Sequence, residues 1–276
     1  MLNVGLYIVA TPIGNLRDIS ARALETLEKA DIIACEDTRV SKKLFKLLGL
    51  NTNKKFICYE DHREPQTAKL LAEQIKTGLS VALISDAGSP LISDPGYKLV
   101  RLCKQENIKV YAVPGASAVI SALQLSGLPS NRFLFAGFIE NKQKARQSLF
   151  QELKNINATL IFYETAPRLI ETLKTMQEIF TTREIAVARE ITKVYEECIN
   201  GTADELISHF QNQPPKGEIV LLVAPPQEKT TDIDIACELK KRLKKMSLKQ
   251  AVAEVVELSG AKKNDVYALG LKIKDE

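Results

Sequence analysis

Short apolar runs alternate with amphipathic segments along the first half of the chain. The runs are apolar at successive positions, which is typical of strands buried on both faces of a parallel sheet. They predict strands over residues 6–10, 31–35, 56–59, 81–84 and 110–113. The segments between them carry apolar residues at helical spacing, and they predict a helix capped at Asp18 or Ser20 and helices over 41–48 and 67–77. The first half is therefore expected to be an α/β domain with a mainly parallel sheet.

The second half has longer apolar runs and ends in a different pattern. Strands are predicted over 133–138, 158–163, 185–188 and 219–224, with helices over 142–153 and 168–180. We expect a second α/β domain with a mixed sheet, followed by a linker over 225–231. Helices are then predicted over 235–245, 247–258 and 263–269, with a turn at Gly260. The expected domains are 1–117, 118–226 and a small helical, helix-turn-helix-like tail over 232–276.

Composition places the chain among ordinary globular proteins. It has 276 residues, of which 45% are hydrophobic and 26% are charged. No apolar run approaches the roughly 20 residues of a membrane-spanning helix, so no membrane partner is expected. The opening residues lack the basic region of a signal peptide. Five scattered cysteines without a C-x-x-C pair, and two histidines, argue against a disulfide framework or a metal site. These features favour a reducing, cytoplasmic location.

The charge is mildly basic and unevenly distributed. A net charge of +4 permits an acidic partner without requiring one. The tail contains a dense basic stretch formed by Lys240, Lys241, Arg242, Lys244, Lys245 and Lys249. Such a stretch either contacts nucleic-acid phosphates or is a solvated helix face, and the sequence leaves both interpretations open.

Four predicted strands of the first half end in loops rich in glycine, proline, serine and aspartate. These loops cover residues 11–18, 36–39, 85–96 and 114–118. In an open parallel sheet they meet at the carboxyl ends of the strands, where ligands bind. Glycine lets the backbone approach a ligand closely. A need to turn the chain explains one such loop, but it does not explain the aspartate, threonine and arginine residues that accompany the turns. We therefore expect a ligand pocket at this edge.

The spacing of the first loop resembles a dinucleotide-binding unit but lacks its essential glycines. Gly14 is followed about 20 residues later by Glu36, the position of a ribose-binding acid. The G-x-G-x-x-G turn is missing, however, and no Walker lysine loop occurs. The pattern thus favours a nucleoside-like ligand without a pyrophosphate. S-adenosylmethionine fits this description, although the pattern alone does not identify it.

Two further polar segments follow strands of the second half. They cover residues 163–168 and 188–193, and they are joined by Glu196, Glu197 and the segment 216–218. Structural interpretations exist for both. Arg168 could cap a helix or pair on the surface, and Glu190 with Lys193 could be an exposed helical pair worth under about 1 kcal/mol.

Taken in order, these segments resemble the ribosomal RNA small subunit methyltransferase I family. These enzymes are 16S rRNA cytidine 2′-O-methyltransferases of the tetrapyrrole (corrin/porphyrin) methylase superfamily. The similar segments are 11–16, 35–39, 85–96, 113–118, 163–168 and 188–193. The similarity runs from about residue 5 to about residue 225, and the basic helical tail is also similar. The combination is far more specific than any one motif.

The resemblance implies a fold, a cofactor and a substrate. It implies a two-domain tetrapyrrole-methylase-like α/β fold, usually a homodimer, with S-adenosylmethionine bound between the domains. The implied substrate is the ribose of a cytidine in the decoding region of 16S rRNA, within the assembled small subunit. The implied cofactor contacts are Asp86, Gly88, Ser89, Pro90, Leu91, Ile92, Pro114, Gly115, Ser117, Ala118, Tyr163, Arg189 and Glu218. The expected RNA contacts are Arg168 and the tail residues Lys241, Arg242, Lys244, Lys245 and Lys249.

The implied reaction needs orientation and a proton acceptor. A methyl transfer is in line when the attacking oxygen lies near the methyl carbon, about 3 Å away. A ribose hydroxyl attacks well only when its proton leaves. The candidate acceptors are Glu36, Asp37 and Glu164, with Asp37 favoured over Glu36. The candidate phosphate or oxyanion partners are Arg39, Arg168 and Lys193.

One departure from the family pattern weakens a role for the loop at 163–168. The family often has a histidine at the position of Pro167, and proline cannot take up a proton. We therefore assign no base to this loop on the strength of the resemblance alone.

Two alternative functions share the expected fold. A methylase of a small tetrapyrrole precursor would need a cleft for a macrocycle but has no use for a basic helical tail. A non-catalytic nucleotide-sensing or RNA-binding module would not need several acidic groups at one cleft. Methyl transfer to small ribosomal subunits separates both alternatives from the main prediction.

Overall fold

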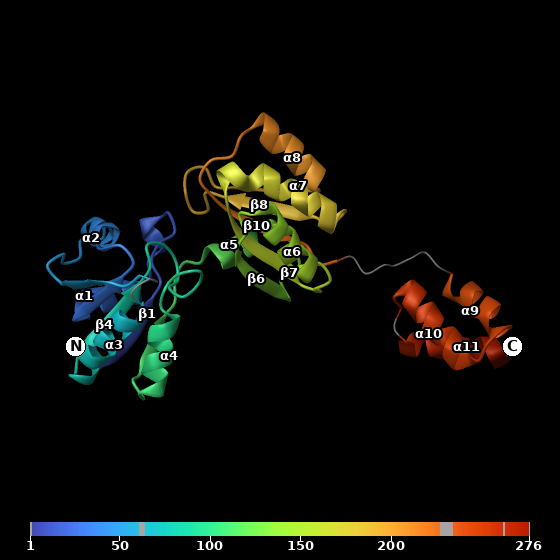
Figure 1. Ribbon diagram of the computed structural model, residues 1–276, viewed down its shortest axis with the longest axis horizontal. Helices are drawn as coiled ribbons and strands as arrows, with labels where there is room; N and C mark the ends of the chain where they lie inside the picture. Colours follow the sequence, from blue (N-terminus) through green and yellow to red (C-terminus); the bar gives the residue numbers. More distant parts are fainter. Residues whose placement is uncertain (1, 61–63, 227–233, 262, 276) are drawn as a thin grey trace. The chain divides into compact units, whose positions relative to one another are not determined.

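The computed structural model describes residues 2–60, 64–226, 234–261 and 263–275. It divides into two compact units, residues 1–225 and 226–276. The first unit contains two five-stranded sheets with helices packed on them (Figure 1). Most of the predicted linker over 225–231 lies outside the described residues.

The first sheet is parallel throughout, as predicted. Its order is β3-β2-β4-β1-β5, and every neighbouring pair runs in the same direction. The strands are β1 (Gly5–Val9), β2 (Ile32–Cys35), β3 (Lys55–Cys58), β4 (Ser80–Ile84) and β5 (Val110–Val113). Because all strands point the same way, the loops that leave their carboxyl ends gather at one edge of the sheet.

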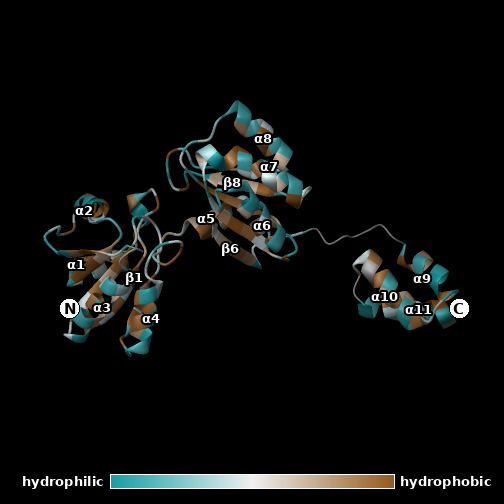
Figure 2. Cartoon of the chain, viewed as in Figure 1, coloured by the Kyte–Doolittle hydropathy of each residue, from teal (hydrophilic) through white to brown (hydrophobic). Residues whose placement is uncertain are grey.

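Helices cover both faces of the first sheet, which explains why its strands are apolar at successive positions. Leu6 and Leu83 face one layer, formed by α3 (Glu64–Lys76) and α4 (Tyr97–Gln105). Val9 and Ile84 face the opposite layer, formed by α1 (Ala21–Lys29) and α2 (Thr38–Leu47). Hydrophobic residues lie on the strands and on the helix faces turned towards them (Figure 2).

The second sheet is mixed, again as predicted. Its order is β6-β7-β10-β8-β9, with β6 parallel to β7 and the other pairs antiparallel. The strands are β6 (Phe133–Phe138), β7 (Thr159–Thr165), β8 (Ile185–Arg189), β9 (Glu197–Gly201) and β10 (Glu218–Val223).

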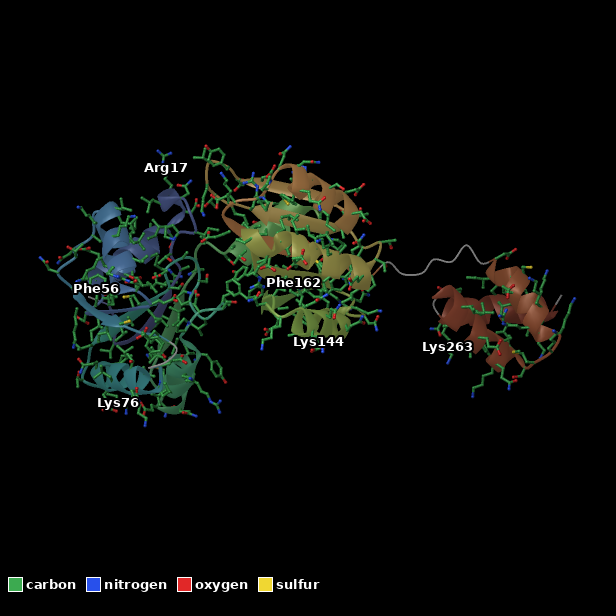
Figure 3. All side chains as sticks on the ribbon, turned by 45° about the horizontal axis from the view of Figure 1, so that its top comes forward. Arg17, Phe56, Lys76, Lys144, Phe162 and Lys263 are labelled. Carbon is green, nitrogen blue, oxygen red and sulfur yellow. The ribbon has the colours of Figure 1, made fainter. Side chains whose placement is uncertain are left out.

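Its two faces are also covered. The helix α5 (Ala118–Ser126) packs on one face. The other face carries α6 (Gln143–Leu153), α7 (Leu169–Phe180) and α8 (Ala203–Asn212), with Phe162 fully buried between them and the sheet (Figure 3). Short 3-10 helices occur at η1 (Leu16–Asp18) and η3 (Ala166–Arg168).

The helices α4, α5 and α8 and the strand β9 were not predicted. All but α8 lack a simple local signal, whereas α8 starts with a capping box of Thr202 and Glu205. The helix α5 is apolar over most of its length, which hides its period. The N-cap residue of α4 is Gly96, which supplies no capping side chain. The strand β9 is a half-buried edge strand, and α8 follows it directly. The helix α2 begins at Thr38 rather than the predicted Ser41, because Asp37 caps it.

The second unit contains α9 (Ile235–Leu243), α10 (Leu248–Ser259) and α11 (Lys263–Asp275) among its described residues. Asp234 caps α9, and Ser247 with Gln250 forms a capping box at α10. Leu239, Val252, Val255 and Val266 are buried together and form a small core of this unit. No helix in the described part of the chain is long and apolar enough to cross a membrane.

Candidate functional site

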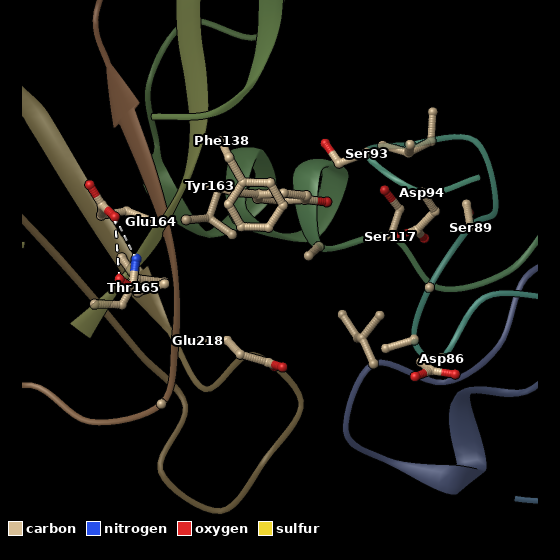
Figure 4. A pocket seen from close by; sticks show the side chains of 18 of the residues that line it. Asp86, Ser89, Ser93, Asp94, Ser117, Phe138, Tyr163, Glu164, Thr165 and Glu218 are labelled. Carbon is tan, nitrogen blue, oxygen red and sulfur yellow. Dashed lines mark hydrogen bonds between the residues drawn. The ribbon is translucent and has the colours of Figure 1, made fainter. Parts of the chain in front are cut away.

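A cavity of about 430 Å³ lies in the first unit, where loops of the first sheet meet β7 and β10 of the second. A volume of this size suits a small-molecule ligand. The first-sheet loops contribute Ile13, Glu36, Ser117 and residues 86–89 and 92–94, and the second sheet contributes Phe138, Tyr163, Glu164, Thr165 and Glu218 (Figure 4). Several segments distant in sequence therefore converge on one pocket, at the edge that the strand pattern predicts.

The segment between β4 and α4 forms one wall of the cavity and has an unusual backbone. Leu91 and Ser93 have φ angles of 73° and 66°, which fall in the left-handed region although neither residue is glycine. Such conformations carry strain and persist only where the surroundings impose them. We call residues 85–96 the β4 loop.

The first loop of the chain holds the start of the β4 loop. The Thr11 amide donates to the Gly88 carbonyl at 2.8 Å, and the Gly88 amide donates to the Thr11 carbonyl at 3.1 Å. The Thr11 hydroxyl also donates to the carbonyl of Ser85 at 3.2 Å. This pair of loops is thus tied together beside the cavity.

A buried carboxylate holds the other end of the β4 loop. Oε1 of Glu64 accepts hydrogen bonds from the amides of Gly96 at 3.1 Å and Lys98 at 3.2 Å, and from the Tyr59 hydroxyl at 3.1 Å. These two amides belong to the first turn of α4, so Glu64 caps a helix that has no cap of its own. Burial alone would raise the pKa of Glu64, but the hydrogen bonds from Gly96, Lys98 and Tyr59 hold that pKa below its usual value.

Gly96 is required where the β4 loop enters α4. Its φ is 139°, and a Cβ there would lie 2.8 Å from Cδ1 of Leu91 and 2.9 Å from Cδ2 of Leu83. A side chain would therefore clash with both the β4 loop and the sheet.

The cavity wall is acidic. The described residues that line it include the carboxylates Glu36, Asp86, Asp94, Glu164 and Glu218, and none of those lining residues is a lysine, arginine or histidine. Burial raises the pKa of Asp86, and the negative charge of Asp37 adds to this effect. The arrangement suits a cationic ligand and disfavours a phosphate, which usually needs cationic partners.

An aromatic surface faces the acidic loops. The Tyr163 ring contacts Phe135 and Phe138 edge-on, with centroid distances of 4.8 and 5.2 Å. Its hydroxyl points towards the segment that carries Ser93 and Asp94 (Figure 4). Burial, together with the charges of Asp94 and Glu218, raises the pKa of Tyr163 to about 12, so the hydroxyl is protonated at neutral pH.

The structure places the expected cofactor residues in two groups. Those that line the cavity are Asp86, Gly88, Ser89, Ile92, Ser117, Ala118, Tyr163 and Glu218. Pro90, Leu91, Pro114 and Gly115 belong to the same loops but are not part of the lining. Arg189 is also outside the lining, and its guanidinium pairs with the Glu197 carboxylate.

Asp37 lies beside the cavity, but its carboxylate is engaged in structural contacts. Its carboxylate caps α2 through the amide of Arg39 at 2.7 Å and forms an ion pair with the Arg39 guanidinium at 2.8 Å. Hydrogen bonds from Arg39 lower the pKa of Asp37 to about 2. A carboxylate with so low a pKa is a weak base, whereas Glu36 is one of the residues lining the cavity. The geometry therefore favours Glu36 over Asp37, the reverse of the sequence-based preference.

Glu164 is engaged in a buried network. Its carboxylate accepts from the Thr165 amide at 2.7 Å and from the Thr172 hydroxyl at 2.5 Å, and it pairs with Arg168 at 3.1 Å. Arg168 also donates to the Ile139 carbonyl. This geometry favours a positioning role for both residues at the base of the aromatic wall.

Lys193 is outside the cavity lining but contacts one of its carboxylates. Its ammonium lies 2.9 Å from Glu190 and 3.0 Å from Glu218. Burial alone would lower the pKa of Lys193, but the hydrogen bonds to these two carboxylates raise it. Lys193 is therefore protonated and can fix the orientation of Glu218.

The basic residues of the tail differ in their surroundings. Lys241 pairs with Glu238 at 3.0 Å, and Arg242 pairs with Glu254 at 3.0 Å. Lys244, Lys245 and Lys249 are exposed on the second unit.

Sequence reasoning missed several residues of the cavity. They are Ile13, Ala87, Ser93, Asp94, Phe138, Thr165, Gly217, Ile219 and Val220. Asp94 could have been predicted, because the Asp94-Pro95-Gly96 sequence lies within a loop already expected to bind a ligand. Phe138 carried none, since an apolar residue at the end of a strand is usually part of a core. Among the described residues no group of three or more histidine, cysteine, aspartate or glutamate side chains could hold a metal ion.

Comparisons with known proteins agree on one family. The model of the tetrapyrrole (corrin/porphyrin) methylases matches residues 5–207, and that of an RsmI C-terminal HTH domain matches residues 234–274. The chain is 46% identical to ribosomal RNA small subunit methyltransferase I of Rickettsia prowazekii, over 97% of this chain and 94% of the relative. It is 48% identical to the protein of the same name from Erythrobacter litoralis, over 99% and 96%.

Solved structures support the fold alone. A uroporphyrin-III-C-methyltransferase from Thermus thermophilus matches with a TM-score of 0.56 and 19% identity, over 79% of this chain and 93% of its own. A diphthine synthase matches with a TM-score of 0.60 and 17% identity, over 79% and 89%.

The role of Glu64 is testable through stability. Glu64→Gln should lower the free energy of unfolding at pH 7 by about 1.5–3 kcal/mol, the usual contribution of a hydrogen bond to a charged group. The folded-state pKa of Glu64 is lowered. The stabilisation is therefore present above the unfolded pKa of about 4.3 and disappears as the pH falls through the folded value. Urea unfolding of both proteins between pH 3 and 7 measures this difference.

Glu73→Gln is a matched control on the same helix, because Glu73 is exposed and pairs only with a surface lysine. It should change the free energy of unfolding by less than about 0.5 kcal/mol. A Glu64 variant as stable as the wild type at pH 7, or a difference that grows in acid, would contradict the capping role.

Proposed function

Because this chain belongs to the ribosomal RNA small subunit methyltransferase I family of the tetrapyrrole (corrin/porphyrin) methylases, we propose that it methylates the 2′-hydroxyl of a cytidine in 16S rRNA. S-adenosylmethionine is the proposed methyl donor, and the decoding region of the assembled small subunit is the proposed target. Membership of this family makes the chain an rRNA methyltransferase. The identity of the methyl donor, of the methylated nucleotide and of the methylated ribose position goes beyond family membership and belongs to the proposal. The observation that carries them is the acidic, aromatic-walled cavity at the strand ends.

The residues present fit this donor. S-adenosylmethionine carries a sulfonium and an ammonium group, both of which are attracted by Asp86, Asp94 and Glu218. The adenine ring requires an apolar or aromatic surface, and Tyr163 and Phe138 offer one. The backbone of Gly88 can approach the ligand closely, since this residue has a φ of 79° and no side chain. These features support a cationic nucleoside over a dinucleotide or a triphosphate.

The protein contributes to the reaction mainly by orienting the methyl group and the ribose oxygen. The sulfonium of the bound donor supplies an electrophilic methyl group. The cavity walls would hold that group in line with a ribose oxygen, and exclusion of water would strengthen the charge contacts. We place the proton acceptor at Glu36, which lines the cavity. Asp37 is paired with Arg39, and Glu164 lines the cavity too but is held by Thr172 and Arg168. A general base of this kind contributes about 10²–10⁴-fold to the rate.

Three further features belong to the same proposal. We propose that the protein acts in the cytoplasm as a homodimer, and that its first unit comprises functional domains over 1–117 and 118–226. Light scattering of the purified protein measures the oligomeric state directly. We also propose that the second unit contacts rRNA through its basic residues.

Methyl transfer tests the function itself. Small ribosomal subunits from a strain that lacks this modification should accept labelled methyl groups, and nuclease digestion with mass spectrometry should recover 2′-O-methylcytidine. Calorimetry should show binding of S-adenosylmethionine without RNA. Label in a tetrapyrrole precursor but not in RNA would favour the small-molecule alternative, and RNA binding without donor binding would favour a non-catalytic module.

The assignment of the base is tested by two matched substitutions. Glu36→Gln should lower kcat by about 10²–10⁴-fold while leaving the Kd for S-adenosylmethionine within about threefold, because it removes a proton acceptor and little volume. Asp37→Asn keeps a good N-cap residue and should lower kcat by less than about tenfold. If Asp37→Asn is the more damaging change, the acceptor is Asp37, as the sequence alone suggested.

The role of the tail is tested by charge. Deleting residues 230–276 should weaken binding to small subunits and reduce the salt dependence of Kd, because each phosphate contact contributes roughly 0.7–0.9 to the slope of log Kd against log salt. The matched variant in the full chain carries Lys244→Glu, Lys245→Glu and Lys249→Glu, and should reproduce most of the change. The Kd for S-adenosylmethionine should be unchanged in both proteins. An unchanged salt slope in both would show that the tail is not an RNA contact.

A further inference from the structure

The turn between β8 and β9 exposes two large apolar side chains. It covers residues 190–196, and Val194 and Tyr195 are 92% and 72% exposed. Among the described residues, these are the two most exposed large hydrophobic side chains. An exposed aromatic side chain loses the favourable free energy that its burial would provide. Such exposure indicates a binding surface.

Hydrogen bonds hold the backbone of this turn. The Lys193 amide donates to the Glu190 carbonyl at 3.0 Å, and the Glu196 amide donates to the Lys193 carbonyl at 3.2 Å. The Glu196 carboxylate accepts from the Thr192 amide at 2.6 Å. Glu190 and Thr192 have left-handed φ angles of 48° and 66°. The turn therefore presents Val194 and Tyr195 from a fixed, strained backbone.

The turn also lies beside the cavity. The Lys193 ammonium bonds to Glu218, which lines the cavity, at 3.0 Å. Gly14, in the first loop of the chain, packs so closely on the turn that a Cβ there would lie 2.6 Å from Cγ of Lys193 and 2.8 Å from Oγ1 of Thr192. The neighbouring residue Ile13 is itself part of the cavity wall.

The nearby surface suits a polyanion although the cavity does not. Arg17 is exposed on η1, three residues after Gly14, and projects outward (Figure 3). The Arg39 side chain is 90% exposed next to Asp37, whose amide donates to the Asp86 carboxylate at 3.3 Å. Arginines outside an acidic cavity can contact phosphates while the carboxylates inside hold a cation.

We propose that Tyr195 stacks on an unpaired base of the RNA segment that carries the target nucleotide, with Val194 extending the contact. This inference rests on the proposed function. The ribose must reach the donor in the cavity, so the bases joined to it lie at the rim, where this turn is. Unpaired RNA bases are recognised by stacking on aromatic side chains, and such a contact tolerates different sequences.

The enzyme's kinetics test the contact. Tyr195→Ala in the full chain should raise the KM for small ribosomal subunits by about 10- to 100-fold and leave the Kd for S-adenosylmethionine unchanged. Tyr195→Phe keeps the ring and should remain within about threefold of the wild type. Tyr97→Ala is the matched control, since Tyr97 is 62% exposed and outside the cavity lining, and its KM should stay within about twofold.

A spectroscopic readout tests stacking directly. The chain contains no tryptophan, so Tyr195→Trp places a single indole at the turn. Its fluorescence should be quenched when small subunits are added, and the quench should saturate at concentrations near the KM. A tryptophan introduced at Tyr97 should show no such quench.

Several outcomes would overturn this inference. They are an unchanged KM for Tyr195→Ala, a Tyr195→Phe variant as weak as Tyr195→Ala, and an indole that is not quenched. A change in oligomeric state on Tyr195→Ala, measured by light scattering, would instead assign the turn to a contact between protein copies. If the wild type methylates no RNA, the proposed function and this inference both fail; if the wild type is active and only these tests fail, the proposed function stands.

Discussion

The conformation of the β4 loop is the constraint on which the cavity depends. The loop is strained at Leu91 and Ser93, and it keeps this shape because it is held at both ends. The paired amides and carbonyls of Thr11 and Gly88 hold its start, and the buried Glu64 carboxylate holds its end. Neither Thr11 nor Glu64 lines the cavity, yet both decide where its acidic wall lies.

The charges divide into two regions with different tasks. Within the cavity, the described lining offers carboxylates and no cationic side chain, which favours a positively charged nucleoside. Next to it, two cationic side chains are placed differently. Lys193 is held by Glu190 and Glu218, while the Arg39 side chain extends into solvent. The separation lets one surface receive a cationic donor and a polyanionic substrate together.

Much of the fold could be predicted because the pattern of each strand is local. The nine strands expected from apolar runs are all present, and the parallel and mixed sheets follow from their lengths and spacing. The position of the cavity followed from one rule, that polar loops meet at the carboxyl ends of parallel strands. Two of the missed elements depend on partners outside their own segment. The helix α4 takes its cap from Glu64, and β9 depends on pairing with β8.

The site was less predictable than the fold because roles depend on partners. Asp37, Glu36 and Glu164 are equivalent acids in the sequence. The structure shows Asp37 as a helix cap paired with an arginine, outside the cavity lining. Glu36 and Glu164 both line the cavity, but the Glu164 carboxylate is engaged by Thr172 and Arg168. Tyr195 could not be singled out either, because only the fold reveals that it is exposed beside the cavity.

The central claim is that the β4 loop and the aromatic wall form one pocket for a cationic nucleoside. A crystal structure with S-adenosylmethionine, or with sinefungin as a stable cationic analogue, tests it most directly. We expect the nucleoside between the backbone of residues 86–89 and the ring of Tyr163, with its cationic groups nearest the carboxylates of the cavity. A ligand bound elsewhere on the protein, or no ligand at millimolar concentration, would contradict this account.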